Sequence, residues 1–160
     1  MAQEIERKFL TKSDAWRSNA IGRFYRQGYL STVKERTVRI RTIRNEGYIT
    51  VKGIAKGATR AEYEYEIPVK DANEMLDTLC EQPIIEKMRY EIEHNELIWL
   101  VDEFEGVNKG LILVEVELSD ENQKIVLPDW VGAEVTGDPN YFNSNLTRNP
   151  YSGWGEKTII

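Results

Sequence analysis

The segment "EIERKFL" (residues 4–10) places three charged side chains, Glu4, Glu6 and Lys8, two positions apart. Successive side chains of a β-strand point to opposite faces, so these three share one face of an extended strand. Either that face meets water, or it meets a ligand that needs two carboxylates and an ammonium close together. On the opposite face we expect Arg7 to be an ordinary solvated residue.

Short alternating runs of this kind dominate the first two thirds of the chain. The predicted strands cover residues 4–10, 22–31, 36–43, 47–53, 61–69, 86–93, 97–106 and 111–118. Hairpin-length turns that contain Gly or Asn separate several of them, for example "RNEG" (44–47). Strands joined by such turns pair antiparallel. The pattern therefore predicts an antiparallel sheet of about eight strands.

Helical patterns are few, which indicates an α+β protein dominated by strands. One helix is predicted over residues 13–20 and another over 71–80, where Asp71 and Glu74 have the spacing of a capping box. The apolar residues expected on the buried face of the second helix are Met75, Leu76, Leu79 and Cys80. After Pro128 the chain is rich in Gly, Pro and Asn, so only short helical or looped pieces are expected there.

The composition excludes several classes of protein. With 160 residues, 41% of them hydrophobic, the chain is expected to form one domain over residues 1–160. Its only cysteine, Cys80, and its only histidine, His94, exclude an internal disulfide and leave too few ligands for a usual zinc site. A net charge of −6 argues against nucleic acid as a partner. The sequence shows no signal peptide or membrane-spanning run, so we expect a cytoplasmic protein without a membrane partner.

The charged faces of the predicted strands are sorted by sign. Arg39 and Arg41 share one face, and Lys87 and Arg89 share another. The acidic faces carry Glu62, Glu64 and Glu66 in one strand and Glu115 and Glu117 in another. A solvated face explains any one strand taken alone. Like charges on neighbouring positions repel, however, so the sorting is unfavourable unless a ligand compensates it.

About eight antiparallel strands are enough to close a barrel, which has an inside and an outside. If the charged faces pointed into a dry interior, their desolvation would cost far more free energy than folding supplies. We therefore expect a wet tunnel lined by the charged faces, with helices covering the apolar outer face.

Carboxylates on some walls and cations on others suit a polyanion bound together with a divalent cation. Mg²⁺ and Mn²⁺ prefer oxygen ligands, and Arg and Lys bind phosphate oxygens through charge-assisted hydrogen bonds. Other phosphate-binding devices, the Walker motif and GxGxxG, are absent from the sequence. The segment "VKGIAKGATR" (51–60) is expected to be a mobile loop from which Lys56 and Arg60 could reach a ligand at the tunnel mouth.

Several motifs in order along the chain resemble those of one family. They are "EIERK", "RIR", "VKG", "EYEYE", "KMR", "VDEF", "VEVE" and "EVTGDPNYFNSNL". The series resembles the CYTH family, also called triphosphate tunnel metalloenzymes, which includes inorganic triphosphatases, thiamine triphosphatases and class IV adenylyl cyclases. The resemblance spans nearly the whole chain and is greatest to short bacterial inorganic triphosphatases. It implies an eight-stranded antiparallel β-barrel whose lumen binds a triphosphate and a divalent metal.

The resemblance also implies roles for the residues at matching positions. The metal ligands would be Glu4, Glu6, Glu115 and Glu117. The phosphate-binding residues would be Lys8, Arg39, Arg41, Lys52, Lys87 and Arg89. An acidic wall that holds a second metal or positions water would be completed by Glu62, Glu64 and Asp102. Tyr29 and Lys87 would act together near the reacting phosphate, with Tyr25 as an alternative to Tyr29 in the same strand.

The expected activity is hydrolysis of inorganic triphosphate to pyrophosphate and phosphate, with Mg²⁺ or Mn²⁺ as cofactor. A class IV adenylyl cyclase and a thiamine or nucleoside triphosphatase remain alternatives, because the resemblance implies that they share the lumen residues. A non-catalytic polyphosphate-binding module would keep the basic walls without needing the carboxylates, so the presence of both favours an enzyme. The expected partner is a small-molecule triphosphate, and the resemblance makes a homodimer plausible.

Overall fold

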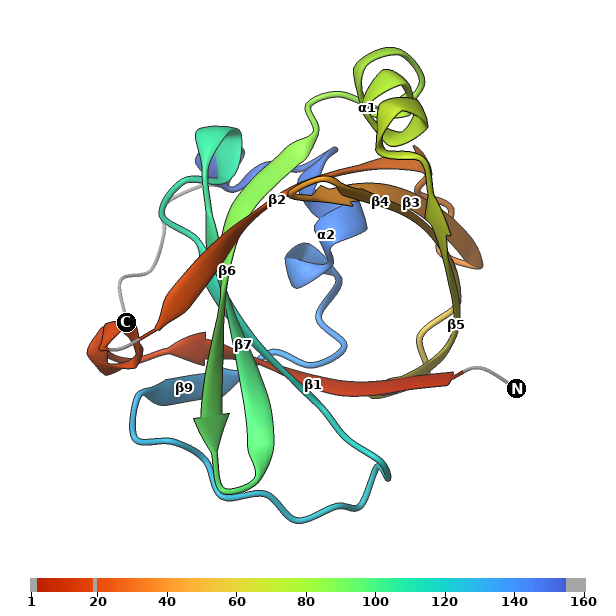
Figure 1. Cartoon of the computed structure of the whole chain (residues 1–160). Coiled ribbons are helices and arrows are strands. Elements are labelled where there is room, and N and C mark those ends of the chain that lie inside the picture. The colour runs from red at the N-terminus through yellow and green to blue at the C-terminus, as the bar shows by residue number, and fades with distance from the viewer. Residues whose placement is uncertain (1–2, 19, 155–160) are drawn as a thin grey trace.

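The computed structural model describes residues 3–18 and 20–154. Within these residues one antiparallel sheet has the strand order β5-β4-β3-β2-β6-β7-β8-β1-β9 (Figure 1). Eight of its strands close into a barrel, because β1 pairs with β5 as well as with β8. The strands are β1 (Gln3–Thr11), β2 (Ile21–Ser31), β3 (Arg36–Ile43), β4 (Glu46–Gly53), β5 (Thr59–Ile67), β6 (Ile85–His94), β7 (Leu97–Phe104), β8 (Ile112–Glu117) and β9 (Val131–Glu134).

The predicted α+β class and the eight-stranded antiparallel barrel are confirmed, and all eight predicted strands are present. The ninth strand, β9, was not predicted. It pairs with Phe9 and Thr11 of β1, beyond the stretch Gln3–Ile5 that pairs with β5. Its four residues include a glycine and show no clear alternation, so the free part of β1, and not the local sequence, explains why this segment is a strand.

The helices differ from the prediction. The first expected helix is a single 3₁₀ turn, Ala15–Arg17. The second is α1 (Val69–Thr78), whose N-cap is Pro68. No side-chain hydrogen bond caps α1, so the predicted capping box of Asp71 and Glu74 is wrong. The remaining helical pieces are the 3₁₀ turns Gly106–Asn108, Pro139–Tyr141 and Tyr151–Gly153 and the short helix α2 (Asn143–Leu146).

Two glycines allow α1 to lie close against the outer face of the barrel. A Cβ atom at Gly28 of β2 would lie 2.9 Å from the Cβ of Cys80, and one at Gly47 of β4 would lie 2.8 Å from the Cβ of Ala72. Contacts that short do not occur between ordinary side chains. A larger residue at either position would therefore push the end of α1 or the segment that follows it away from the sheet.

The apolar core beneath α1 is small. It consists of buried Ile40, Ala72, Leu76 and Cys80. Leu79 was expected on the same buried face but is 66% exposed. It follows the last helical residue as the C-cap, where the backbone leaves the helical periodicity that the prediction assumed.

The larger core lies outside the barrel, over β1, β7 and β8. It contains Phe9, Trp16, Trp99, Val101, Val114, Val116, Leu118, Trp130 and Val131. The expectation that apolar strand faces point outward is thus confirmed, although β9 and irregular segments, and not helices, cover this side. Arg7 also lies on the outer face and donates two hydrogen bonds, of 2.9 and 2.7 Å, to the carboxylate of Glu134 in β9. The expectation that Arg7 is an ordinary solvated residue is therefore wrong, because the partner strand was not foreseen.

The segment after β9 lies across one end of the barrel. In Figure 1, α2 is seen through the barrel at its far end. Leu146 of α2 is completely buried in a cluster that includes Tyr29, Ile85 and Phe104. The segment around α2 therefore covers the far end of the lumen, and it leaves the near end in Figure 1 uncovered. None of the described helices is long and apolar enough to cross a membrane.

The packing of α1 predicts a large difference between two leucines of the same segment. Leu76→Ala should lower the free energy of unfolding by about 2–4 kcal/mol, because it leaves a cavity under the helix. Leu79→Ala should change it by less than about 0.5 kcal/mol, because this side chain is exposed. Urea denaturation of both variants measures the difference, and equal losses would contradict the assignment of the buried face.

Candidate functional site

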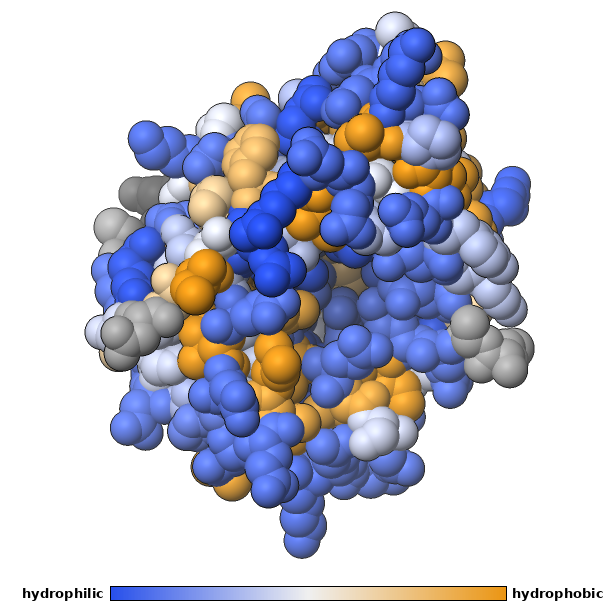
Figure 2. Space-filling model, viewed as in Figure 1, coloured by the Kyte–Doolittle hydropathy of each residue, from blue (hydrophilic) through white to orange (hydrophobic). Residues whose placement is uncertain are grey.

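The barrel encloses a cavity of about 190 Å³ that is lined mostly by charged side chains. Figure 2 shows its mouth as a hollow surrounded largely by hydrophilic residues. The cationic lining residues are Lys8, Arg39, Arg41, Lys52, Arg60, Lys87 and Arg89. The acidic ones are Glu4, Glu6, Glu62, Glu64, Glu115 and Glu117, and the others are Tyr29, Thr37, Leu100, Asn143 and Ser144.

Every predicted site residue except Asp102 lines this cavity. Arg60 lines it as well, whereas Lys56, the other residue expected at the mouth, does not. The prediction missed Thr37, although this residue is in phase with Arg39 and could have been found by the same alternation. It also missed the residues that α2 and β7 contribute, because α2 is too short to show a period and Leu100 carries no charge.

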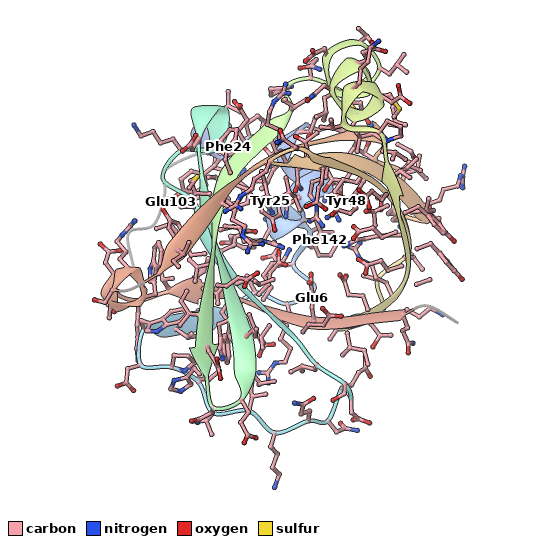
Figure 3. The ribbon with its side chains drawn as sticks, in the orientation of Figure 1. Glu6, Phe24, Tyr25, Tyr48, Glu103 and Phe142 are labelled. Carbon is pink, nitrogen blue, oxygen red and sulfur yellow. The ribbon has the colours of Figure 1, made fainter. Side chains whose placement is uncertain are left out.

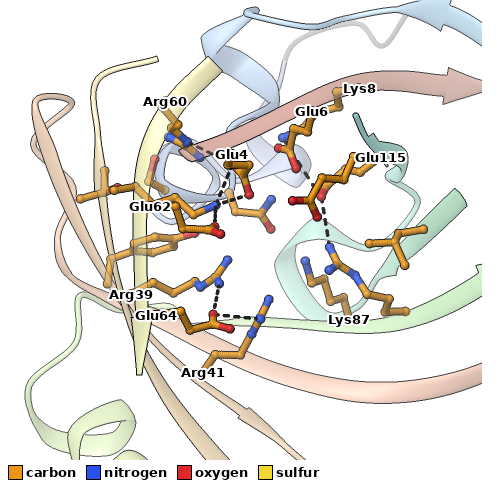
Figure 4. Close-up of a pocket in the computed structure, with 18 residues that line it drawn as sticks. Glu4, Glu6, Lys8, Arg39, Arg41, Arg60, Glu62, Glu64, Lys87 and Glu115 are labelled. Atoms are coloured by element: carbon orange, nitrogen blue, oxygen red, sulfur yellow. Dashed lines mark hydrogen bonds and ion pairs between the residues drawn. The ribbon is translucent and has the colours of Figure 1, made fainter. Parts of the chain in front are cut away.

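The arginines of β3 carry buried hydrogen-bond donors without a partner among the described residues. Nη2 of Arg39 lies 3.2 Å and Nη2 of Arg41 3.3 Å from the same oxygen of Glu64 (Figure 4). The Nε atoms of both arginines are buried, and neither has a hydrogen-bond partner in the described part of the chain. A buried donor without a partner is unfavourable, so each guanidinium would gain a hydrogen bond by moving to bring its Nε to an anion.

A second cationic pair holds Glu4. Nζ of Lys52 lies 3.3 Å from both carboxylate oxygens of Glu4, and Nε of Arg60 lies 3.5 Å from one of them. Burial acts to raise the pKa of Glu4, but Lys52 and the other neighbours outweigh it and the pKa lies below the usual value. Glu4 is therefore an ionised carboxylate in the ligand-free protein.

Asp102 is on the inward face of β7, directly across from Arg89, but it pairs with Lys87 and Arg89 and does not itself line the cavity. It is completely buried and accepts hydrogen bonds from Nζ of Lys87 at 2.8 Å and from Nε and Nη2 of Arg89 at 2.7 and 2.8 Å. Burial and the charge of Arg89 lower the pKa of Lys87 to about 7, against the opposing effect of Asp102. Asp102 thus orients two cations that the lumen presents, and Lys87 is poised to lose its proton near neutral pH.

Glu6, like Glu117, is a lumen carboxyl without an ion-pair partner among the described residues. Its side chain makes no hydrogen bond or ion pair with any residue in the described ranges. Burial and the nearby charges of Glu115 and Glu4 raise its pKa to about 8. Burial and the charge of Glu4 also raise the pKa of Glu117. With a pKa of about 8, Glu6 is mostly protonated at neutral pH in the ligand-free protein, and a nearby cation would restore its charge, which fits a cation site at this wall of the lumen.

The four predicted metal ligands nevertheless do not form a ready-made cluster. No three acidic, histidine or cysteine side chains converge to hold an ion within residues 3–18 and 20–154. Ion pairs hold two of the four in place, because Glu4 is paired with Lys52, and Glu115 lies 3.3 Å from Arg89 and 4.0 Å from Lys8. Carboxylate oxygens are the ligands that hard divalent cations prefer, so these four residues have the right chemistry for such an ion although they do not converge on one here.

Tyr29 lines the lumen next to the segment that covers its far end. Its hydroxyl accepts a hydrogen bond from Nε2 of Gln27 at 3.3 Å, and the same amide donates to Asn143 at 3.2 Å. Burial raises the pKa of Tyr29, so the hydroxyl stays protonated. Tyr25, the predicted alternative, lines a separate recess that it shares with Arg89, and not the charged cavity.

Fold and site together define a tunnel-shaped barrel with a lumen lined by charged side chains. The model of the CYTH domain matches residues 2–150, so the chain belongs to the CYTH family. It is 53% identical, over 98% of its length and 100% of the relative, to the inorganic triphosphatase of Acetivibrio thermocellus.

Solved structures show the same similarity. The structure of the inorganic triphosphatase NE1496 is 34% identical, with a TM-score of 0.65 over 89% of this chain and 96% of that one. The PH1012 protein of Pyrococcus horikoshii OT3 is 20% identical, with a TM-score of 0.56 over 74% of this chain and 80% of that one, and shares the fold.

Because Glu6 is buried without an ion-pair partner, we expect it to lower the free energy of unfolding of the ligand-free protein. Because the pKa of Glu6 rises from about 4.5 to about 8 on folding, folding at pH 7 must protonate this carboxyl or bury its charge; Glu6→Gln removes that cost and should raise the Tm at pH 7 by about 2–4 °C in the presence of EDTA. Glu35→Gln, at an exposed turn position, should leave the Tm unchanged. Differential scanning calorimetry measures both, and a lower Tm for Glu6→Gln would show that this carboxylate supports the fold.

Proposed function

We propose that this protein hydrolyses inorganic triphosphate to pyrophosphate and phosphate inside the barrel. The observation that carries the proposal is the arrangement of charge in the lumen. Arginines with unpaired Nε donors lie on one wall, and Glu6, a carboxyl without an ion-pair partner among the described residues, lies on the other. The 53% identical relative, which is named an inorganic triphosphatase, supports the same substrate.

Charge balance explains why the substrate should bind together with a cation. Seven cationic side chains line the lumen, and six carboxylates plus the buried Asp102 oppose them. The ligand-free lumen is thus formally neutral when all these groups are ionised. A triphosphate alone would leave it with several excess negative charges, and a divalent cation offsets part of that excess.

The basic residues bind the phosphate oxygens by exchanging partners. Arg39 and Arg41 turn from Glu64 to the phosphate and add their free Nε donors, while Lys52 leaves Glu4. The residues proposed to bind phosphate are Lys8, Arg39, Arg41, Lys52, Lys87 and Arg89, of which Lys87 and Arg89 keep their ion pairs with Asp102. Each exchange replaces one ion pair by another. The affinity for the phosphate therefore comes from the Nε donors that were unpaired before and from the better hydrogen-bond geometry of an arginine with a phosphate.

Carboxylates of β1 and β8 hold the cation. Glu4, Glu6, Glu115 and Glu117 are the proposed ligands of Mg²⁺ or Mn²⁺, which neutralises charge on the phosphate oxygens when it is bound. Glu62 and Glu64 keep Lys52 and the β3 arginines in place until the substrate arrives.

The chemical step breaks the bond between the terminal phosphorus and its bridging oxygen. A water molecule attacks that phosphorus, its oxygen forms the new bond, and pyrophosphate leaves with the bridging oxygen. The neutral amine of Lys87 accepts the proton from the water, and the protonated hydroxyl of Tyr29 donates a hydrogen bond to the reacting phosphate. Asp102 acts through Lys87 and Arg89 and does not touch the substrate.

A substrate panel tests the proposed activity. We expect the protein with MgCl₂ or MnCl₂ to release equal amounts of phosphate and pyrophosphate from tripolyphosphate, faster than it degrades ATP or thiamine triphosphate. Glu6→Gln should lose this activity while Glu35→Gln keeps it. Cyclic AMP as the main product from ATP would instead identify an adenylyl cyclase, and binding without turnover of any substrate would identify a binding module.

Arg39 offers a second test, because the same strand holds a matched control. Arg39→Ala removes two phosphate donors and should raise KM roughly 10- to 100-fold. Arg36→Ala, at the exposed start of β3, should leave KM unchanged. Steady-state kinetics give both values. If Arg39→Ala lowered the Tm sharply without changing KM, the charged face would be structural and the binding assignment wrong.

The low pKa of Lys87 predicts the pH dependence. Because the neutral amine is the proposed proton acceptor, kcat should rise as the pH increases through about 7 and then level off. Lys87→Arg, which stays protonated, should be nearly inactive at every pH. Rates measured at saturating tripolyphosphate check this. A fall in kcat above pH 7 would mean that the cationic form of Lys87 is the active one.

A further inference from the structure

We propose that Tyr25 is a positioning residue that holds the phosphate-binding cations of two strands in the geometry that the triphosphate requires. Figure 3 shows Tyr25 within the barrel, whereas its neighbour Phe24 lies toward the outside. Tyr25 lies in β2, between the strand that carries Arg41 and the strand that carries Lys87 and Arg89. The inference rests on the triphosphatase function proposed above.

Three cations surround the Tyr25 ring. The Cζ atoms of Arg41 and Arg89 each lie 5.2 Å from its centroid. Nζ of Lys87, whose residue pairs directly with Tyr25 across β2 and β6, lies 5.9 Å away. The electron-rich face of an aromatic ring attracts cations at these distances, most strongly where water is excluded, and Tyr25 is only 7% exposed.

The ring matters most for Arg41. Asp102 anchors Lys87 and Arg89, so both would keep their place without Tyr25. Arg41 has only Glu64 as an ion-pair partner in the described part of the chain, at 3.3 Å. Once Glu64 is exchanged for phosphate, the ring is the protein contact that still fixes the guanidinium, and it offsets the repulsion between Arg41 and Arg89.

Two observations distinguish this role from ordinary packing. Tyr25 belongs to none of the three buried apolar clusters formed by the described residues, so its neighbours in the lumen are mainly cations. Its hydroxyl makes no hydrogen bond with those residues, so the ring and not the phenol carries the effect. Phenylalanine should therefore replace it, and an aliphatic side chain should not.

The test compares Tyr25→Leu, Tyr25→Phe and the outward-facing control Phe24→Leu. Tyr25→Leu should raise KM for tripolyphosphate roughly tenfold, with kcat changed less than about threefold. Tyr25→Phe should restore KM to within about twofold of the wild type. Phe24→Leu should leave both constants unchanged. A trifluorinated phenylalanine at position 25 keeps the shape of the ring but weakens the negative potential of its π face, so it should raise KM as leucine does. This variant replaces Tyr25→Leu in the test if Tyr25→Leu fails to fold.

The outcomes separate this inference from the proposed function. If the wild type hydrolyses tripolyphosphate but Tyr25→Leu and the fluorinated variant keep its KM, the role of Tyr25 is overturned and the function stands. If the wild type shows no hydrolysis, the proposed function fails. The role of Tyr25 is then tested by titration calorimetry, which measures the affinity of the same variants for tripolyphosphate in the presence of MgCl₂. A wild type that neither hydrolyses nor binds tripolyphosphate overturns both.

Discussion

The balance of opposite charges inside the barrel is the constraint on which the rest of the structure depends. Buried charges are tolerated only when they are paired, and here neighbouring strands supply the partners. Lys52 and Glu4, the β3 arginines and Glu64, and Lys87 with Asp102 are such pairs. The barrel can therefore fold without a ligand. A ligand that binds takes the place of some of these ion-pair partners and does not create the site. Glu6 and Glu117 are the exceptions among the described lumen residues, and their missing partners mark where added positive charge belongs.

A charged lumen obliges the molecule to build its apolar core elsewhere. The strands turn their apolar faces outward, and three separate coverings bury them: α1 on one side, the tryptophan-rich cluster with β9 on another, and the segment around α2 at one end. The close approach of α1 needs the glycines of β2 and β4. The same segment that closes the far end also supplies Asn143, which links through Gln27 to Tyr29, so closure and the site are built together.

Sequence alternation predicted the barrel and nearly all of its lumen, because a period of two reports directly which side chains share a face. Alternation could not predict that Asp102 is withdrawn from the cavity. Only the three-dimensional structure shows that it is bound by Lys87 and Arg89. Nor could alternation find β9, which forms because β1 offers a free edge, or the partner of Arg7 on that strand. Local rules also failed at the ends of α1, where tertiary packing and Pro68 decide the boundary.

A crystal structure with tripolyphosphate and Mn²⁺, located by its anomalous signal, tests the central claim most directly. We expect the metal inside the barrel against Glu6 and the neighbouring carboxylates, and the phosphates on Arg39 and Arg41, with the ion pair between Lys52 and Glu4 opened. Tripolyphosphate bound outside the lumen, or bound inside it while every ligand-free ion pair persists, would contradict the exchange of partners that the charge balance requires.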